Sequence, residues 1–228
     1  MAEEKLRVKI EGEYLNYMYK LGFLSKSELY DNLQWLTAVQ TSYEQFKEFT
    51  FQPDDIRILL ALRNPLGQMA EAYMRVYDAE AFALAVGGGL YVINSESEKP
   101  LPNFPSADAG FVKTDDPDKA AYLQRIDSEY ASYRKSVMQQ SREQMIDNAE
   151  SIAMRQAVYG AMKAYPYHKD ELAVVSALES PLKAVGDAVD KEDSTDALTK
   201  ADIFDFSLAY LQKNGSKQSK KKRHESTR

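Results

Sequence analysis

Apolar residues recur along much of the chain at spacings of three and four, which is typical of helices that bury one face. The spacing predicts helices over about residues 4–22, 26–49 and 54–63. Pro65 then suits the first turn of a fourth helix, where a missing amide proton costs nothing. The same order of signals returns later in the chain and predicts helices over about 117–138, 142–165 and 169–179, with Pro181 opening another.

These two sets of helices are also related residue by residue. Residues 10–85 align with residues 126–201 without a gap, at a shift of 116 positions, and 18 of the 76 positions are identical. Composition alone would give roughly five identities. Both halves contain the motif Ala-Leu-x-x-Pro-Leu, at 61–66 and 177–182, and a serine (Ser25, Ser141) followed three residues later by Glu or Gln, as in a capping box. We therefore predict an all-α fold of two tandem, duplicated helical modules; the alternative is a chance match of two amphipathic arrays.

The residues between and after the modules have a different composition. The run Gly87-Gly88-Gly89 predicts the end of the fourth helix, and the apolar residues 90–93 predict a minor β-like segment. Residues 94–116 lack periodicity and predict a surface linker, whereas 201–211 predict a final helix. The Lys/Ser-rich end of the chain predicts disorder. The expected domains are a first module over 1–89, a linker over 90–116, a second module over 117–212 and a disordered basic tail over 213–228.

The charges are distributed unevenly between the tail and the rest of the chain. Residues 213–228 carry seven Lys or Arg and one Glu, so residues 1–212 have a net charge of −12 within the total of −6. An acidic body repels nucleic-acid phosphates and suits a basic partner. The alternative is that the acidic surface only keeps the protein soluble.

Cysteine is absent, so disulfides, thiolate metal sites and thiol nucleophiles are excluded. The beginning of the sequence has no apolar core of a signal peptide, and no run reaches membrane-spanning length. We therefore expect a cytoplasmic protein with no membrane contact.

Residue patterns of known enzyme sites are also missing from the sequence. Only His168 and His224 are present, and no zinc motif, phosphate-binding loop, nucleophile elbow or dinucleotide fingerprint occurs. The acidic pairs Asp54/Asp55 and Asp170/Glu171 fall at predicted helix starts, where carboxylates cap free amides. We expect no catalytic residue, no cofactor and no metal, and we interpret the protein as not an enzyme.

Tyrosine is unusually frequent, with 15 residues against one tryptophan. Tyr14, Tyr17 and Tyr43 recur in the second module, which favours a place in the core. Aromatic residues without a tyrosine counterpart are better candidates for a protein interface, because tyrosine combines a rigid apolar ring with a polar tip. The predicted partner-binding residues are Tyr19, Tyr30, Trp35, Tyr73 and Tyr77, and the tail offers a nucleic-acid contact through Lys220, Lys221, Lys222 and Arg223.

The helical array that ends in Ala-Leu-x-x-Pro-Leu resembles uncharacterised helical domains of bacterial mobile genetic elements. Those domains occur in large polyvalent proteins together with anti-restriction domains. The resemblance covers about 75 residues of each module, and its one specific motif is six residues long. It implies a gene carried by a phage or a conjugative element and a role against host defence, without assigning a functional residue.

Together these observations lead to a functional hypothesis. We expect a protein inhibitor of a bacterial defence nuclease, anti-CRISPR or anti-restriction, that binds a host defence protein or nuclease ribonucleoprotein and occludes its basic nucleic-acid site. The alternative is a nucleic-acid-binding accessory or regulatory protein of a mobile element, and a third hypothesis is a structural adaptor. The sequence does not indicate an oligomeric state.

Overall fold

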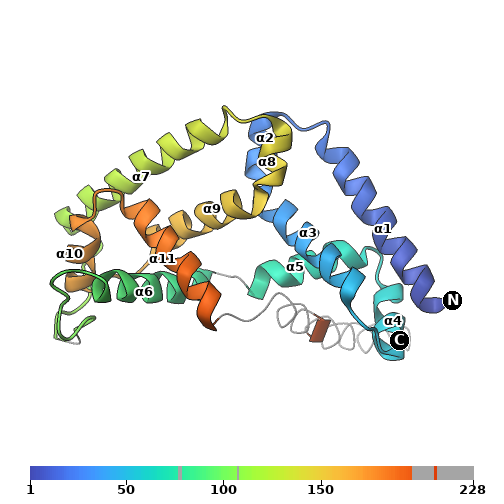
Figure 1. Cartoon of the computed structure of the whole chain (residues 1–228), viewed down its shortest axis with the longest axis horizontal. Helices are drawn as coiled ribbons and strands as arrows, with labels where there is room; N and C mark the ends of the chain where they lie inside the picture. The colour runs from blue at the N-terminus through green and yellow to red at the C-terminus, as the bar shows by residue number, and fades with distance from the viewer. Residues whose placement is uncertain (77–78, 107, 197–207, 210–228) are drawn as a thin grey trace, which may run out of the picture. The chain divides into compact units, whose positions relative to one another are not determined.

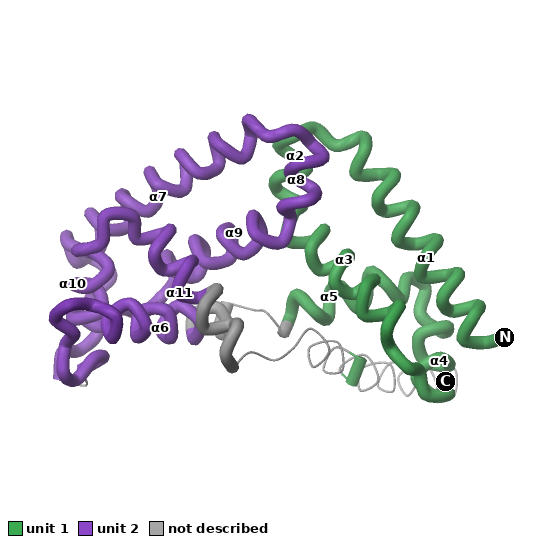
Figure 2. Tube along the Cα trace, viewed as in Figure 1, with its two compact units in different colours: residues 1–77, 198–228 green, residues 78–197 purple. Residues whose placement is uncertain are grey.

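A computed structural model describes residues 1–76, 79–106, 108–196 and 208–209, and these are mostly helical (Figure 1). The all-α prediction is confirmed for this part of the chain, which contains no named strand. The chain divides into two compact units, one of residues 1–77 with 198–228 and the other of residues 78–197 (Figure 2). No described helix is both long enough and apolar enough to cross a membrane.

Residues 1–76 of unit 1 form five helices that follow one another along the chain. They are α1 (Ala2–Leu21), α2 (Lys26–Asp31), α3 (Leu33–Glu48), α4 (Pro53–Ala61) and α5 (Pro65–Val76). Their apolar faces meet in one core, in which α1, α3 and α5 pack against one another. The core includes Leu6, Ile10, Val39, Phe46, Leu59 and Met69, all at most 2% exposed.

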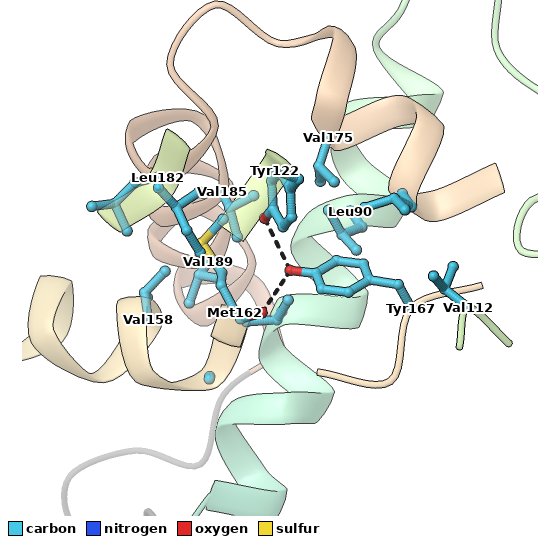
Figure 3. Close-up of a cluster of buried hydrophobic side chains, with 14 of the residues drawn as sticks. Leu90, Val112, Tyr122, Val158, Met162, Tyr167, Val175, Leu182, Val185 and Val189 are labelled. Carbon is cyan, nitrogen blue, oxygen red and sulfur yellow. Dashed lines mark hydrogen bonds between the residues drawn. The ribbon is translucent and has the colours of Figure 1, made fainter. Parts of the chain in front are cut away.

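The described residues of unit 2 form six helices, with a long connection between the first two of them. The helices are α6 (Ala79–Ser95), α7 (Pro117–Val137), α8 (Arg142–Asp147), α9 (Ala149–Ala164), α10 (Lys169–Ala177) and α11 (Pro181–Asp196). Helix α6 packs against α9, α10 and α11. The shared core includes Leu90, Ile126, Val158, Val175 and Val185, each completely buried (Figure 3).

The predicted helix starts are confirmed at the level of individual hydrogen bonds. Ser25 accepts from the amide of Glu28 at 3.2 Å, and the Glu28 carboxylate accepts from the Ser25 amide at 2.7 Å. Ser141 and Gln144 make the same reciprocal pair at 3.1 and 2.8 Å. Helices α5 and α11 begin at the two prolines of the Pro-Leu motif. Each hydrogen bond of the two serine caps satisfies an amide donor that the start of the helix otherwise leaves free.

The prediction of single helices over 26–49 and 142–165 is wrong. Each region forms a six-residue helix followed by a 16-residue helix, with Asn32 and Asn148 at the two breaks. Asn32 has φ −101° and ψ 2°, and its side-chain amide donates to the Glu28 carbonyl at 2.7 Å. Asparagine competes with the helix for backbone partners in this way, so the apolar stripe continues while the helix does not.

The glycine run does not end a helix, and the predicted short strand over 90–93 is wrong. Helix α6 continues through both to Ser95. A Cβ atom at Gly87 would lie 3.0 Å from the Tyr165 hydroxyl, and one at Gly89 would lie 3.2 Å from Val189. Glycine therefore allows α6 to lie close to its neighbours in unit 2, and this close packing offsets the low helix propensity of glycine.

The connection between α6 and α7 contains no helix, as predicted, but it is not only a surface segment. Phe104 and Val112 are each 9% exposed and belong to the unit 2 core. The Val112 amide donates to the Tyr167 carbonyl at 2.8 Å, and Phe111 forms an isolated antiparallel bridge with His168. The connection therefore covers one end of the core.

The predicted module boundary at residue 89 falls inside α6, so the compact units differ from the predicted domains. Val86 and Leu90 of α6 follow the first set of helices in sequence but are buried in the unit 2 core. Leu208 follows the second set but is 4% exposed in the unit 1 core. Apart from residues 208–209, which are helical, the predicted final helix and the basic tail lie outside the described residues.

Candidate functional site

The five aromatic residues predicted to bind a partner do not form one surface. Tyr19 is 68% exposed, whereas Tyr30 is 2% exposed, so the prediction of an exposed Tyr30 is wrong. Trp35 and Tyr73 are half-buried against the unit 1 core. Tyr77 lies outside the described residues, as do the four predicted tail residues Lys220, Lys221, Lys222 and Arg223.

Tyr19 belongs instead to an exposed apolar face along α1. Val8 is 65% exposed, Leu15 is 59% exposed, and Phe23, in the turn after the helix, is 71% exposed. Val8, Leu15 and Tyr19 are seven and four residues apart, so they lie on one side of the helix. Gly12 lies between them, and a Cβ atom there would meet no described atom within 4 Å. We call Val8, Gly12, Leu15, Tyr19 and Phe23 the α1 outer face.

The opposite side of α1 is apolar as well, and it packs on unit 1. Leu6 is fully buried and Ile10 is 2% exposed, while Tyr14 and Tyr17 are half-buried against the same core. A helix of a water-soluble unit usually presents polar residues on the side that faces solvent. Helix α1 is therefore apolar on two sides, and packing among the described residues of unit 1 accounts for only one of them.

Several polar contacts hold α1 in place and fix the direction of its outer face. The Lys9 ammonium donates to the Leu62 carbonyl at 2.6 Å, and the Glu13 carboxylate accepts from the Leu66 amide at 2.9 Å. Arg7 donates to the carbonyls of Phe46 and Phe49 at 2.9 and 3.1 Å, at the end of α3. These bonds satisfy backbone groups at helix ends, and they hold α1 against α3, α4 and α5.

Charged residues line the two edges of the outer face with opposite signs. Glu4 and Glu11 are exposed along one edge, and Lys9 lies along the other. On a helical projection with 3.6 residues per turn, the acidic pair precedes the apolar line and Lys9 follows it. The outer face is thus a narrow apolar strip with one acidic and one basic margin.

The helix at the same place in unit 2 has a different surface. Helix α7 aligns with α1 at a shift of 116 residues, and its corresponding positions hold Gln124, Ser128, Ala131, Lys135 and Gln139, all exposed. Four of these five side chains are polar or charged. The second helix thus shows what an ordinary solvated surface looks like at these positions, and the α1 outer face departs from it.

The tyrosines shared by the two halves have structural roles. Tyr14 stacks on Tyr43 with ring centroids 3.9 Å apart, and Tyr130 stacks on Tyr159 at 3.8 Å. The Tyr159 hydroxyl donates to Asp127 at 2.6 Å, and Lys163 donates to the same oxygen at 2.8 Å. Hydrogen bonds from Lys163 and Tyr159 lower the pKa of Asp127. These contacts join neighbouring helices within each unit.

Unit 2 also contains a buried polar network that the sequence did not reveal. The Tyr167 hydroxyl donates to the Met162 carbonyl at 2.9 Å, so the Tyr122 hydroxyl, 3.0 Å away, donates to Tyr167 (Figure 3). The Tyr165 hydroxyl donates to Glu171 at 3.0 Å, and Glu171 is 2% exposed. Burial raises the pKa of Tyr122, Tyr165 and Tyr167, which keeps these phenols neutral. All of their hydroxyls have partners, so the network stabilises the core.

The second residue of each predicted acidic pair, Asp55 or Glu171, is a helix cap as predicted, whereas Asp54 pairs with Arg57. Asp55 accepts from the Gln52 amide at 2.9 Å, and Glu171 accepts from the His168 amide at 2.7 Å. Asp170 accepts from the Ser106 amide at 2.6 Å and thereby holds the long connection of unit 2. Within the described ranges, no group of three or more His, Cys, Asp or Glu side chains is placed to hold a metal ion.

Comparison with known proteins adds no further information on the site. No protein-family model matches the chain, and neither the curated proteins nor the solved structures contain a match. Among the described residues, the α1 outer face is the feature that the fold does not explain.

Proposed function

We propose that this protein is a non-enzymatic protein-binding protein and that the α1 outer face is its binding surface. The observation that carries the proposal is the contrast between α1 and α7 at corresponding positions, apolar in one and mainly polar in the other. Contiguous exposed apolar residues with a polar rim are typical of protein interaction sites. Tyrosine and phenylalanine at the end of the strip are residue types enriched at such sites.

The same contrast supplies a test with little risk to the fold. The triple variant Val8→Gln, Leu15→Ala, Tyr19→Lys gives α1 the residues that α7 carries at these positions. Exposed substitutions usually change the free energy of unfolding by less than about 0.5 kcal/mol, so the variant should fold normally. Affinity capture with the tagged wild-type protein should recover a partner that the triple variant loses. A partner captured equally by both proteins would contradict the proposal.

Internal duplication is part of the proposal, and paired contacts support it. Glu13 and Glu129 cap α5 and α11 at Leu66 and Leu182, at 2.9 and 3.0 Å. Lys9 and Arg125 likewise donate to the carbonyls that end α4 and α10. The stacked tyrosine pairs and the reciprocal serine caps follow the same shift of 116 residues. We infer that one module kept a scaffolding role while the other acquired the binding face.

At a finer level, we propose that the acidic body of the protein, apart from the α1 outer face, occludes the nucleic-acid site of a nuclease of a host defence system, in the cytoplasm. The charge of −12 over residues 1–212 supports a basic target surface. In a competition assay, increasing protein should displace DNA or RNA from the nuclease. The alternative, a nucleic-acid-binding accessory protein, is supported by the basic tail. Tight, salt-sensitive binding to free duplex without a protein partner would favour that alternative.

A further inference from the structure

The α1 outer face has the spacing of a helix-pairing surface. Val8, Gly12, Leu15 and Tyr19 follow one another at intervals of four, three and four residues. This alternation produces a straight seam along a helix, and two such seams pack side by side in a coiled coil. A flat protein surface does not require that regularity. The natural occupant of this strip is therefore another helix with a seam of its own.

We propose that this occupant is the α1 helix of a second copy of the chain, lying parallel to the first. The inference rests on the proposed function, because it names the partner of the same face. On each helix, one margin precedes the seam and the other follows it. In a parallel pair, a residue of the preceding margin on one helix meets the residue of the following margin on the other helix that lies about five positions later in the sequence. Glu4 then meets Lys9 of the second copy, and the symmetry of the pair repeats this contact.

The remaining margin positions agree with the same arrangement. Met18 precedes the seam and Phe23 follows it five residues later, so the parallel register brings these two apolar side chains together. The Lys9 ammonium donates to Leu62 within its own chain and has further donors available for Glu4 of the other copy. In this register Glu11 meets the polar side chain of Asn16. An antiparallel pair brings like margins together, so Glu4 would meet no basic side chain.

Gly12 lies within the seam, which permits a close approach of the two helices. A Cβ atom at this position would meet no described atom of its own chain within 4 Å. Lys5, three residues before Val8, occupies the preceding seam position. A single lysine in a seam weakens the pairing of two helices but helps to fix their register. A contact confined to one helix of about 30 Å is small for a protein interface, so we expect a weak, reversible dimer.

Self-association can be measured directly on the purified full-length protein. Sedimentation velocity over a concentration series should show a monomer–dimer equilibrium for the wild-type chain. The triple variant Val8→Gln, Leu15→Ala, Tyr19→Lys should raise the dissociation constant at least about tenfold. Glu4→Lys should weaken the dimer as well, because it places like charges opposite Lys9. A wild-type chain that stays monomeric, or a dimer insensitive to the triple variant, would overturn the inference.

The parallel direction has its own test, because the natural chain contains no cysteine. Under mild oxidation, Val8→Cys should form a disulfide-linked dimer, since identical seam positions face each other in a parallel pair. Gln124→Cys, at the corresponding position of α7, is the matched control and should form no disulfide-linked dimer. Cross-linking between Val8→Cys and Tyr19→Cys in a mixture, without either variant linking to itself, would indicate antiparallel pairing and overturn the proposal.

The two proposals can fail separately. If the wild-type chain is monomeric but captures a different protein through the α1 outer face, the parallel dimer is wrong and the binding function remains. If neither self-association nor capture depends on this face, both proposals fail. The sedimentation series and the capture experiment use the same triple variant, so their results can be compared directly.

Discussion

At the scale of single residues, buried hydroxyl groups distinguish the two cores. In unit 2, the hydroxyls of Tyr122 and Tyr167 are hydrogen-bonded to each other and to a backbone carbonyl. The positions 116 residues earlier hold Leu6 and Phe51, which fill the corresponding part of unit 1 without polar atoms. The sequence alignment shows the substitutions, but only the structure shows that the two hydroxyls depend on each other.

This dependence predicts a non-additive pair of mutations. Tyr167→Phe leaves the Met162 carbonyl and the Tyr122 hydroxyl without their partner, so it should lower the free energy of unfolding by about 1–3 kcal/mol. The double variant Tyr122→Leu, Tyr167→Phe copies unit 1 and should lose less than the sum of the two single changes. Urea unfolding of the four proteins measures the coupling. Strict additivity would show that the hydroxyls act independently.

Tyr17 provides a second prediction, which concerns alkaline pH. Its hydroxyl is buried and has no hydrogen-bond partner among the described residues, and burial raises its pKa to about 12. The unfolded value is about 10, so the folded state favours the neutral phenol. Stability from this preference is complete below pH 10 and is lost as the pH rises from 10 towards 12.

Tyr17→Phe should therefore reduce the slope of stability against pH in that range, because it removes one group that titrates differently in the two states. Below pH 9 the variant should be as stable as the wild-type chain or up to about 1 kcal/mol more stable, since it removes an unpaired buried hydroxyl. Chemical unfolding at a series of pH values measures both effects. An unchanged slope, or a clear loss below pH 9, would contradict this account.

At the scale of helices, the sequence predicted where helices begin better than where they end. Serine caps and first-turn prolines are local signals, and Ser25, Pro65, Ser141 and Pro181 each mark a helix start. The breaks at Asn32 and Asn148 and the continuation of α6 through its glycines depend on neighbouring elements, which a single sequence does not show. The α1 outer face was also hidden, because apolar residues on both sides of a helix cancel the usual contrast between faces.

The role of glycine predicts opposite results at two helical positions. Gly160 lies within α9, a Cβ atom there would meet no described atom within 4 Å, and unit 1 holds Glu44 at the corresponding place. Gly160→Ala should raise the free energy of unfolding by about 0.5–1 kcal/mol. Gly89→Leu should lower it by about 1–3 kcal/mol, because the new side chain meets Val189. Thermal unfolding distinguishes the two effects, and stabilisation by Gly89→Leu would contradict the close packing of α6.

At the scale of the whole molecule, unit 1 draws on both ends of the sequence, whereas unit 2 is one continuous segment. Helix α6 follows the first module and completes the unit 2 core, while Leu208 follows the second module and is buried in the unit 1 core. Sequence periodicity cannot reveal such an exchange. Periodicity shows which face of a helix is buried, whereas the exchange depends on which module the helix packs against. Cutting the chain between the predicted modules should therefore leave two unstable halves.

Leu208 tests this exchange with one substitution. Leu208→Ala should lower the free energy of unfolding by about 2–5 kcal/mol, as for other buried leucines. Removal of residues 214–228 should change it by less than about 0.5 kcal/mol, since a Lys/Ser-rich segment has little apolar surface to bury. Denaturant unfolding of both variants gives the comparison. A small effect of Leu208→Ala would show that unit 1 does not need this residue.

The claim that α1 carries the binding surface is tested most directly by photo-cross-linking at one matched pair of positions. A photoreactive amino acid at Leu15 should link the protein to its partner, and mass spectrometry identifies that partner as a second copy or a different protein. The same amino acid at Ala131, the corresponding position of α7, should give no specific product. Equal products at the two positions, or none at Leu15, would contradict the account.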